Sequence, residues 1–315
     1  MTQATLTSKS ATKKPLAKKA PVKKTLVKKA AATKPAATKT AAKKSATGKS
    51  VKKSKQVELG DWYDYPQYFD MLFRDETAEE VAFFEKAFAK YANGDIKRLL
   101  EPGCGSGRLV AAMARKGYDV TGLDLSPAML KYLDARIKRG NLSATTVHGD
   151  MTQMQFDEKF DAAFCTFNTF RHLLDEKTAI KHLQNVGEVI REGGLYILGF
   201  HIIPDDADPE CTERWYASHG GTDVKGVLKV IDFNRRKREE MLRVTINAKM
   251  RSGKKQRVAS EFSLRVYTVP QVKSLFRKIS DVWEIAEVFD FDYDIDKTRE
   301  FDDDLTDALF VLRRR

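Results

Sequence analysis

The chain has 315 residues, with 56 lysines and arginines against 44 acidic residues and a formal net charge of +12. Such an excess of positive charge first suggests a protein that binds nucleic acid. The excess lies at one end, because residues 1–56 contain 17 lysines and no acidic residue, which leaves a net charge of −5 for residues 57–315. The composition therefore predicts a basic N-terminal tail over 1–56 and one large domain over 57–315.

Composition also argues against several classes of protein. No stretch approaches the roughly 20 apolar residues of a membrane-spanning helix, and no secretory signal is recognisable. The three cysteines, Cys104, Cys165 and Cys211, are far apart and form no C-x-x-C pair, which argues against a disulfide scaffold and a cysteine-based zinc site. We therefore expect a soluble, cytoplasmic protein in a reducing compartment, with no metal and no membrane partner.

The tail over 1–56 contains no aromatic residue and few large apolar ones, which predicts disorder. Its lysines come mostly in pairs between alanine, threonine and proline, so its composition resembles the tails of linker histones and bacterial histone-like proteins. Lysines without aromatic neighbours neutralise phosphates but read no bases. We expect non-specific DNA or RNA binding, with nucleoid or chromatin association as a consequence; the alternative is a solubility tail without a defined partner.

The first part of the domain is rich in aromatic residues over 61–73, which predicts a lid or a docked strap. Apolar residues at helical spacing then predict a helix over 76–91. From there to residue 201, strands and helices alternate. Strands are expected over 96–100, 118–123, 144–148, 160–167 and 195–201, and helices over 109–116, 129–139 and 177–191, the last ended by Gly193-Gly194. This alternation predicts an α/β fold with a parallel sheet covered on both faces.

Beyond residue 201 the pattern changes to consecutive strands. Residues 224–233, 241–248 and 257–267 predict strands separated by charged turns, which indicates an antiparallel excursion after the fifth strand. A helix over 269–278 and two closing strands over 283–289 and 308–312 complete the expected elements. We assign 203–267 as an antiparallel insertion that forms part of the substrate side.

A glycine-rich turn follows the first expected strand, in the sequence Glu101-Pro102-Gly103-Cys104-Gly105-Ser106-Gly107-Arg108. Glycines at such a turn allow a ligand to approach the backbone closely. The turn departs from the dinucleotide fingerprint G-x-G-x-x-G, because Arg108 stands where the third glycine is expected. Glu101 would repel a pyrophosphate but attract an ammonium group.

This segment resembles motif I of the class I S-adenosylmethionine-dependent methyltransferases, and the resemblance extends over most of 61–315. It implies a Rossmann-like fold with a mostly parallel seven-stranded sheet and helices on both faces, and S-adenosyl-L-methionine as the cofactor. The motif residues that it assigns to cofactor binding are Glu101, Gly103, Cys104, Gly105 and Gly107.

Acidic residues end the next two expected strands in the family's order. Asp124 follows Gly103 by 21 residues and could accept hydrogen bonds from both ribose hydroxyls. By resemblance, Leu125 beside it also belongs to the cofactor site, Asp150 accepts from the adenine amino group, and the Met151 amide addresses the ring. Taken singly, each has a structural explanation, such as a helix cap for Asp124 or a loop acid for Asp150.

Residues 160–168 resemble the fourth-strand motif, whose end borders the transferred methyl group. Asn168, Arg171 and His172 are therefore the catalytic candidates, with Asn168 also a cofactor contact. His172 is either a general base or a structural hydrogen-bond partner, and Arg171 holds either an acidic substrate group or a salt bridge. His201 is expected at the same cleft. Tyr63, Tyr65 and Tyr68 either cap the cofactor or only pack.

Two signatures of base methylation are missing. No proline precedes Cys165, as it would in a cytosine-C5 enzyme, and Asn168-Thr169-Phe170 lacks the Pro-Pro-aromatic sequence of amino-methylating DNA enzymes. The sequence thus predicts a methyltransferase for a small-molecule acceptor, with a tail that tethers it to nucleic acid. The alternatives are a methyltransferase of nucleic acid or of a nucleic-acid-associated protein, and an inactive methyltransferase-fold DNA-binding factor. The net charge of −5 argues against a wide phosphate-binding groove on the domain itself.

Overall fold

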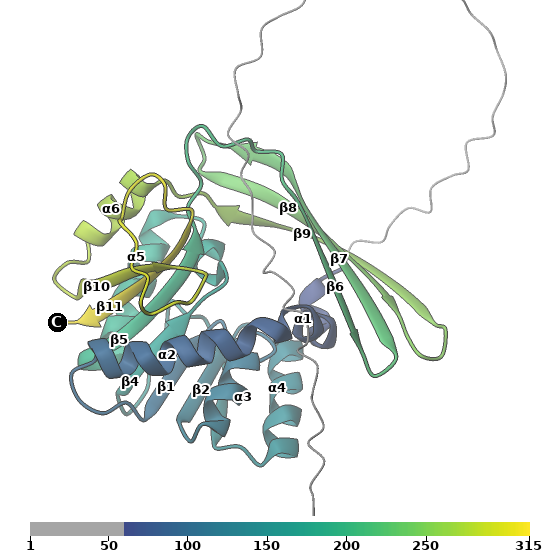
Figure 1. The fold of residues 1–315 in the computed structure, drawn as a ribbon, viewed down its shortest axis with the longest axis horizontal. Coiled ribbons are helices and arrows are strands. Elements are labelled where there is room, and N and C mark those ends of the chain that lie inside the picture. Colours follow the sequence, from purple (N-terminus) through teal and green to yellow (C-terminus); the bar gives the residue numbers. More distant parts are fainter. Residues whose placement is uncertain (1–59) are drawn as a thin grey trace, which may run out of the picture.

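The computed structural model describes residues 60–315, so the disorder expected for 1–56 lies outside the described residues. Two sheets build the molecule (Figure 1). A seven-stranded sheet has the order β10-β11-β5-β4-β1-β2-β3, and a four-stranded sheet has the order β6-β7-β8-β9. None of the helices in this part of the chain has the length and apolar character needed to cross a membrane.

The seven-stranded sheet is mostly parallel, as the sequence predicts. Its strands β1 to β5 run parallel, while β11 pairs antiparallel with both β5 and β10. The carboxyl ends of the parallel strands therefore meet at one edge, where such folds bind ligands. The strands are β1 Arg98–Pro102, β2 Asp119–Asp124, β3 Ala144–His148, β4 Phe160–Cys165, β5 Ile190–His201, β10 Trp283–Asp290 and β11 Asp307–Arg314.

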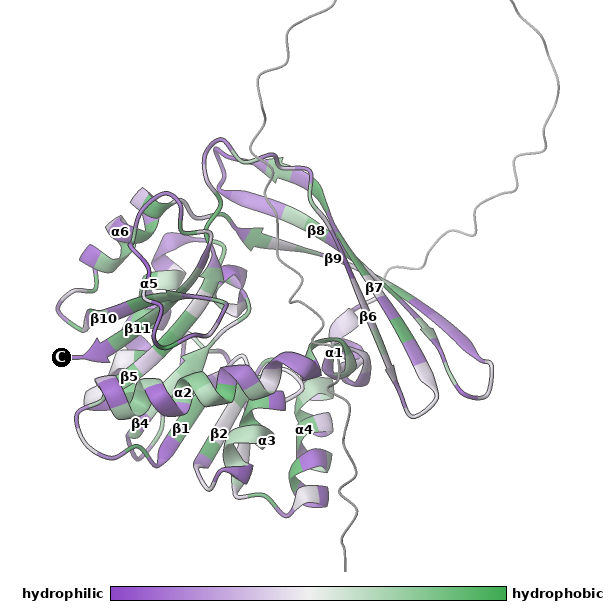
Figure 2. Ribbon diagram, viewed as in Figure 1, coloured by the Kyte–Doolittle hydropathy of each residue, from purple (hydrophilic) through white to green (hydrophobic). Residues whose placement is uncertain are grey.

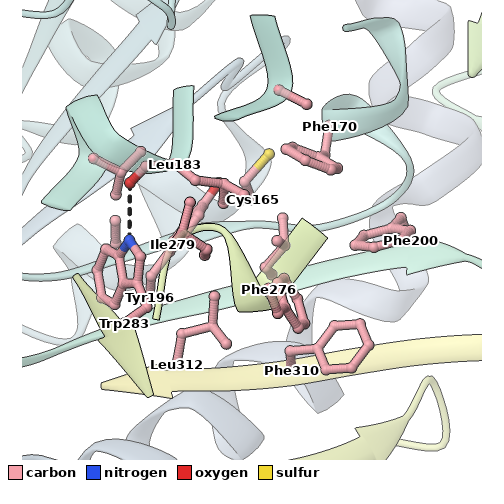
Figure 3. Packing of buried hydrophobic residues seen from close by; sticks show 14 of the residues in the cluster. Cys165, Phe170, Leu183, Tyr196, Phe200, Phe276, Ile279, Trp283, Phe310 and Leu312 are labelled. Atoms are coloured by element: carbon pink, nitrogen blue, oxygen red, sulfur yellow. Dashed lines mark hydrogen bonds between the residues drawn. The ribbon is translucent and has the colours of Figure 1, made fainter. Parts of the chain in front are cut away.

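Helices cover both faces of this sheet. Apolar residues of α2, α3 and α4 pack on one face, and those of α5 and α6 pack on the other. Within the second layer, Trp283 Nε1 donates to the Leu183 carbonyl oxygen at 2.8 Å, so the buried indole keeps its hydrogen bond (Figure 3). The helices are α1 Pro66–Phe73, α2 Thr77–Tyr91, α3 Arg108–Arg115, α4 Pro127–Gly140, α5 Glu176–Val189 and α6 Val269–Arg277, with 3₁₀ turns η1 Trp62–Asp64, η2 Arg74–Glu76 and η3 Thr169–His172.

The four-stranded sheet is entirely antiparallel and follows β5 in the chain. Hydrophilic and hydrophobic residues alternate along its strands, as Figure 2 shows. One face packs on Trp62, Tyr68 and Phe73 of the N-terminal segment, and the other faces solvent. Its strands are β6 Thr212–His219, β7 Thr222–Asn234, β8 Glu239–Lys249 and β9 Lys255–Arg265.

The aromatic segment 61–73 forms η1 and α1. Two local predictions differ from the structure. Strand β6 was not predicted, because it alternates half-buried with exposed residues and carries no buried apolar side chain. Gly193-Gly194 lie inside β5 instead of ending α5: Gly193 has φ +73°, and the register between β4 and β5 shifts there, so the pair forms a bulge.

Candidate active site

A cavity of about 580 Å³ lies between the carboxyl edge of the parallel sheet and the inner face of the four-stranded sheet. Its volume falls within the usual range for small-molecule sites. The segment 61–73 closes one side through Trp62, Tyr63, Phe69 and Phe73. Among residues 60–315, no group of three or more histidines, cysteines or acids is placed to hold a metal ion.

The glycine-rich turn forms one wall, and its backbone conformation requires glycine. Gly103, Gly105 and Gly107 all have positive φ, at +71°, +53° and +66°. A Cβ on Gly103 would lie 2.3 Å from Thr169 Cγ2, and one on Gly107 would lie 2.2 Å from Leu133 Cδ1. Gly103 and Gly105 line the cavity, whereas Gly107 packs behind it.

Asp124 lines the cavity at the end of β2, next to the exposed Leu125. Its two carboxylate oxygens accept from the Gly105 amide at 2.7 Å and from the Ser126 amide at 2.8 Å. Burial raises the pKa of Asp124, and these two hydrogen bonds offset part of the rise. Met151 also reaches the cavity. The carboxylate therefore fixes the turn and also faces the cavity.

Besides Gly107, three predicted cofactor residues do not line the cavity. Glu101 is buried, accepts from the Val110 amide at 3.2 Å, and burial raises its pKa well above the usual range. Cys104 is also buried, and burial raises its pKa strongly. The Asp150 carboxylate accepts hydrogen bonds from Thr152 and Gln153. Partial burial raises the pKa of Asp150, but these hydrogen bonds outweigh it and hold the pKa below the usual value.

Asn168 sits at a strained turn after β4. Both Phe167 and Asn168 have positive φ, at +64° and +69°, which is uncommon for residues other than glycine and is typical of functional sites. The Asn168 side-chain oxygen accepts from the His201 amide at 2.9 Å. It thereby ties the end of β4 to the end of β5, and both residues line the cavity.

Arg171 makes the salt bridge that the sequence left as one of two alternatives. It is fully buried, pairs with Glu240 on β8 at 2.5 Å, and donates from Nε to the Arg265 carbonyl at 2.7 Å. It also donates to Asn168 Oδ1 at 3.3 Å. The guanidinium therefore clamps η3 against the four-stranded sheet at the cavity wall.

His172 faces the cavity and contacts the N-terminal segment. Its Nε2 lies 3.1 Å from the Tyr63 hydroxyl, and its ring packs against Phe262 with centroids 5.4 Å apart. Although the His172 side chain is exposed toward the cavity, desolvation by the surrounding protein, together with the charge of Arg171, lowers its pKa to about 4. Burial also raises the pKa of Tyr63. At neutral pH both groups are therefore uncharged.

Of the remaining sequence candidates, His201 reaches the cavity and Tyr68 does not. His201 Nδ1 lies 2.6 Å from Asp307 Oδ1, and both residues line the cavity. The Tyr68 hydroxyl donates to Gln256 on β9 at 2.8 Å, and the Tyr65 ring stacks on Tyr68, so these two tyrosines serve packing. Only Tyr63 of the three lines the cavity.

A buried polar network beneath the turn was not foreseen. Glu80 on α2 is fully buried and pairs with Arg108, the residue that replaces the third glycine of the dinucleotide fingerprint. Thr166 and the Tyr293 hydroxyl donate to the same carboxylate at 3.2 and 3.1 Å. The one available signal was the presence of Arg108 at a position where glycine was expected.

The low pKa of His172 leads to a testable pH dependence. The unfolded chain takes up a proton near the ordinary pKa of about 6.5, but the folded chain does so only near 4. His172 should therefore make the folded state less stable as pH falls from about 6.5 toward 4. Its ring resonances in NMR, assigned with a His172→Gln variant, should not titrate between pH 8 and about 5.5. A midpoint near 6.5 would contradict this environment.

The sequence comparisons identify a domain. Residues 99–194 match a family model described as a methyltransferase domain. The chain is 28% identical over 138 residues to a putative methyltransferase of Geobacillus sp. (strain WCH70), over 44% of this chain and 56% of the relative. It is 28% identical over 161 residues to the glycine/sarcosine N-methyltransferase of Aphanothece halophytica, over 50% and 58%. The chain thus spans less than two thirds of the length of these relatives.

The structural comparisons cover more of the chain. DesVI of Streptomyces venezuelae matches with a TM-score of 0.66 at 16% identity, over 82% of this chain and 100% of its own. S-adenosylmethionine-bound CalS10, an amino pentose methyltransferase of Micromonospora echinaspora, matches with a TM-score of 0.60 at 20% identity, over 83% and 100%. These matches confirm the predicted Rossmann-like methyltransferase fold, and the family model confirms the resemblance carried by motif I.

Proposed function

We propose that this chain, which has the fold and the methyltransferase domain of the class I S-adenosylmethionine-dependent methyltransferases, transfers a methyl group from that cofactor to a small-molecule acceptor. The observation that carries the proposal is the single cavity that joins the glycine-rich turn to the inner face of the four-stranded sheet. One end of this cavity suits the cofactor, and the other end is closed by apolar side chains.

At the cofactor end, the proposal assigns roles to residues of the carboxyl edge. Gly103 and Gly105 leave the turn without side chains, so a ligand can approach its backbone. Asp124 would accept from the ribose hydroxyls, while Leu125 and Met151 would contact the adenine ring. Glu101, Cys104 and Gly107 would support the turn from behind, and Asp150 would reach the adenine amino group from the loop after β3. When bound, the cofactor supplies a methyl group already activated on a sulfonium.

At the acceptor end, enclosure supports a small molecule over a polymer. Apolar residues of the four-stranded sheet form this part of the wall, and η1 and α1 close the side. Walls on these sides restrict the access of water and favour a small acceptor over a chain of nucleotides. Glu213 and Glu240 of the sheet line the cavity as well. The apolar residues of the sheet that line it are Trp215, Leu228, Val230, Phe233, Leu242, Phe262 and Leu264.

His172 is the group proposed to receive a proton. A hydroxyl acceptor, or an amine that is protonated before transfer, releases one proton when it gains the methyl group, and neutral imidazole Nε2 can take it directly or through the Tyr63 hydroxyl. Asn168 and Arg171 would act as positioning residues, because they hold the turn after β4 between β5 and β8. Alignment of donor and acceptor would account for most of the rate.

Calorimetric titration of the full chain with S-adenosylmethionine and with S-adenosylhomocysteine tests the cofactor assignment. Both should bind, and NAD, which lacks the methionine part, should not. Acceptors can then be screened with a labelled methyl group on the cofactor. If neither sulfur compound binds while the protein remains folded, the proposed activity is wrong.

We further propose that residues 1–56 tether the protein to nucleic acid. The support is the charge of 17 lysines without a single acid. Such a tether should show the salt dependence of phosphate contacts. On duplex DNA, the magnitude of the slope of log K against log salt should fall by about 0.9 for each lysine that is replaced. Replacing Lys13, Lys14 and Lys18 by glutamine should therefore reduce the slope by about 3. An unchanged slope would favour the solubility tail.

A further inference from the structure

Charge is divided very unevenly within the described residues. The four-stranded sheet and its turns, residues 212–265, contain fourteen lysines and arginines and six acids, a net charge of +8. Residues 60–211 and 266–315 together contain 25 basic and 37 acidic residues, a net charge of −12. The net charge of −5 for 57–315, which also counts Glu58, therefore conceals a basic sheet attached to an acidic body.

The strand register shows where these cations lie. Residues paired across two strands share a face of the sheet, and successive pairs alternate between the two faces. The pairs Val224–Ala248 and Leu228–Val244 face inward. The neighbouring pairs Lys225–Asn247 and Lys229–Arg243 therefore face outward. The same alternation through β6 and β9 defines a basic face on the outer side. Its members, with two from the β8–β9 turn, are Arg214, Lys225, Lys229, Arg243, Lys249, Arg251, Lys254, Lys255 and Arg257, all exposed.

Little negative charge opposes the basic face. In the described part of the chain, Arg243 is its one member that pairs with a carboxylate, that of Glu261. The carboxylate of Asp223 accepts from the Tyr216 and Ser218 hydroxyls. The Tyr216 ring is 59% exposed, and the Lys225 ammonium lies 6.0 Å from its centre. An exposed aromatic among cations is typical of nucleic-acid-binding surfaces, where bases stack on the ring.

The position of the basic face separates it from the cavity. Leu228 and Leu242 line the cavity from the inner side of the same strands that carry Lys229 and Arg243 on the outer side. The β6–β7 and β8–β9 turns project away from the parallel-sheet domain (Figure 1). The Gly60 amide donates to the Ala259 carbonyl on β9 at 2.8 Å, so the described chain begins beside this sheet.

We propose that the basic face binds the phosphate backbone of a nucleic acid, as a contact separate from both methyl transfer and the tether in 1–56. Charge complementarity and the exposed tyrosine favour this partner. An anionic membrane is a poorer fit, because surface-binding elements insert many large apolar side chains. Besides Tyr216, the described sheet exposes only Met241 and Ile231 of this kind, each 38% exposed and both far along the strands from Lys225 and Arg257. The nucleic acid would lie across the sheet from the acceptor cavity, as an anchor and not as the methyl acceptor.

The test compares two triple variants of the full chain on a labelled DNA duplex. Lys225→Gln, Lys229→Gln and Arg257→Gln remove three charges from the basic face. In the control, glutamine replaces three exposed cations of α5 and α6, Lys177, Lys181 and Arg277. Loss of three phosphate contacts should lower the magnitude of the slope of log K against log salt by about 3. Raising salt from 50 to 200 mM should therefore weaken DNA binding by wild type about 40-fold more than binding by the Lys225→Gln, Lys229→Gln and Arg257→Gln variant. The control should match wild type.

Chemical acetylation of lysines, measured residue by residue with and without DNA, reports on the basic face separately from residues 1–56. DNA should protect Lys225 and Lys229 from the reagent and leave Lys177 and Lys181 reactive. A slope unchanged by the sheet substitutions but lowered by those at Lys13, Lys14 and Lys18 would leave the tether intact and overturn the basic face. The reverse result would overturn the tether alone. Binding of the basic face to phosphatidylserine vesicles, without protection by DNA, would also overturn the proposal.

Discussion

Replacing Asp124 with alanine should weaken the binding of S-adenosylmethionine by ~2–4 kcal/mol, or about 30- to 1,000-fold in Kd. The variant would lose the acceptor for both ribose hydroxyls. It would also release the Gly105 amide, which Asp124 Oδ2 holds at 2.7 Å, so the glycine-rich turn would lose part of its support. Calorimetric titration of the full chain measures the change directly.

Two controls separate ligand contact from folding. Asp124→Asn keeps one oxygen acceptor and should bind the cofactor with intermediate affinity. Asp134→Ala removes an exposed carboxylate on α4, whose oxygen accepts from Thr146, and should leave cofactor affinity unchanged. Thermal unfolding of each variant without cofactor reports the loss of turn support. Wild-type affinity in a folded Asp124→Ala variant would show that the cofactor site has been placed wrongly.

The turn and the strand ends were predictable because their signals are local. Glycines, a strand-terminal acid and a proline after a serine cap all lie within a few residues of the structure they determine, and Ser126 does accept from the Met129 amide as a cap. The parallel order then brings Gly103, Asp124 and Asn168 to one edge. The parallel strand order therefore allowed motifs that are separate in the sequence to be assigned to one cavity.

The rest of the site depends on partners distant in sequence. His172 meets Tyr63 across 109 residues, and His201 meets Asp307 across 106. No pattern in one sequence specifies such pairs, so the enclosure that lowers the His172 pKa could not be foreseen. Glu101 illustrates the same limit: its type fits an ammonium partner, but packing of α3 places its carboxylate behind the turn.

The distribution of charge could not be predicted for a different reason. A net value for 57–315 combines the acidic body with the basic sheet, and only strand register reveals that the cations share one face. That net charge argued against a wide phosphate-binding groove on the domain itself. Charge computed for each structural unit is therefore the better guide to electrostatic partners.

The salt bridge between Arg171 and Glu240 should be the largest single contributor to holding η3 against the four-stranded sheet. Arg171→Met should lower the free energy of unfolding by ~3–5 kcal/mol, because it leaves the Glu240 carboxylate buried without its partner. The matched control is Arg243→Met, which breaks a half-exposed pair with Glu261 on the same sheet and should cost less than about 1 kcal/mol. Urea unfolding of both variants measures the difference.

The double variant Arg171→Met/Glu240→Met then decides what the pair does. If it serves only to position η3, apolar replacement of both partners should recover most of the stability and keep S-adenosylmethionine affinity. If Arg171 holds an acidic group of the acceptor, the double variant should be stable and bind cofactor but fail in methyl transfer. If Arg171→Met lowers the free energy of unfolding no more than Arg243→Met does, Arg171 does not hold η3 against the sheet, because loss of a fully buried guanidinium leaves a buried carboxylate unpaired.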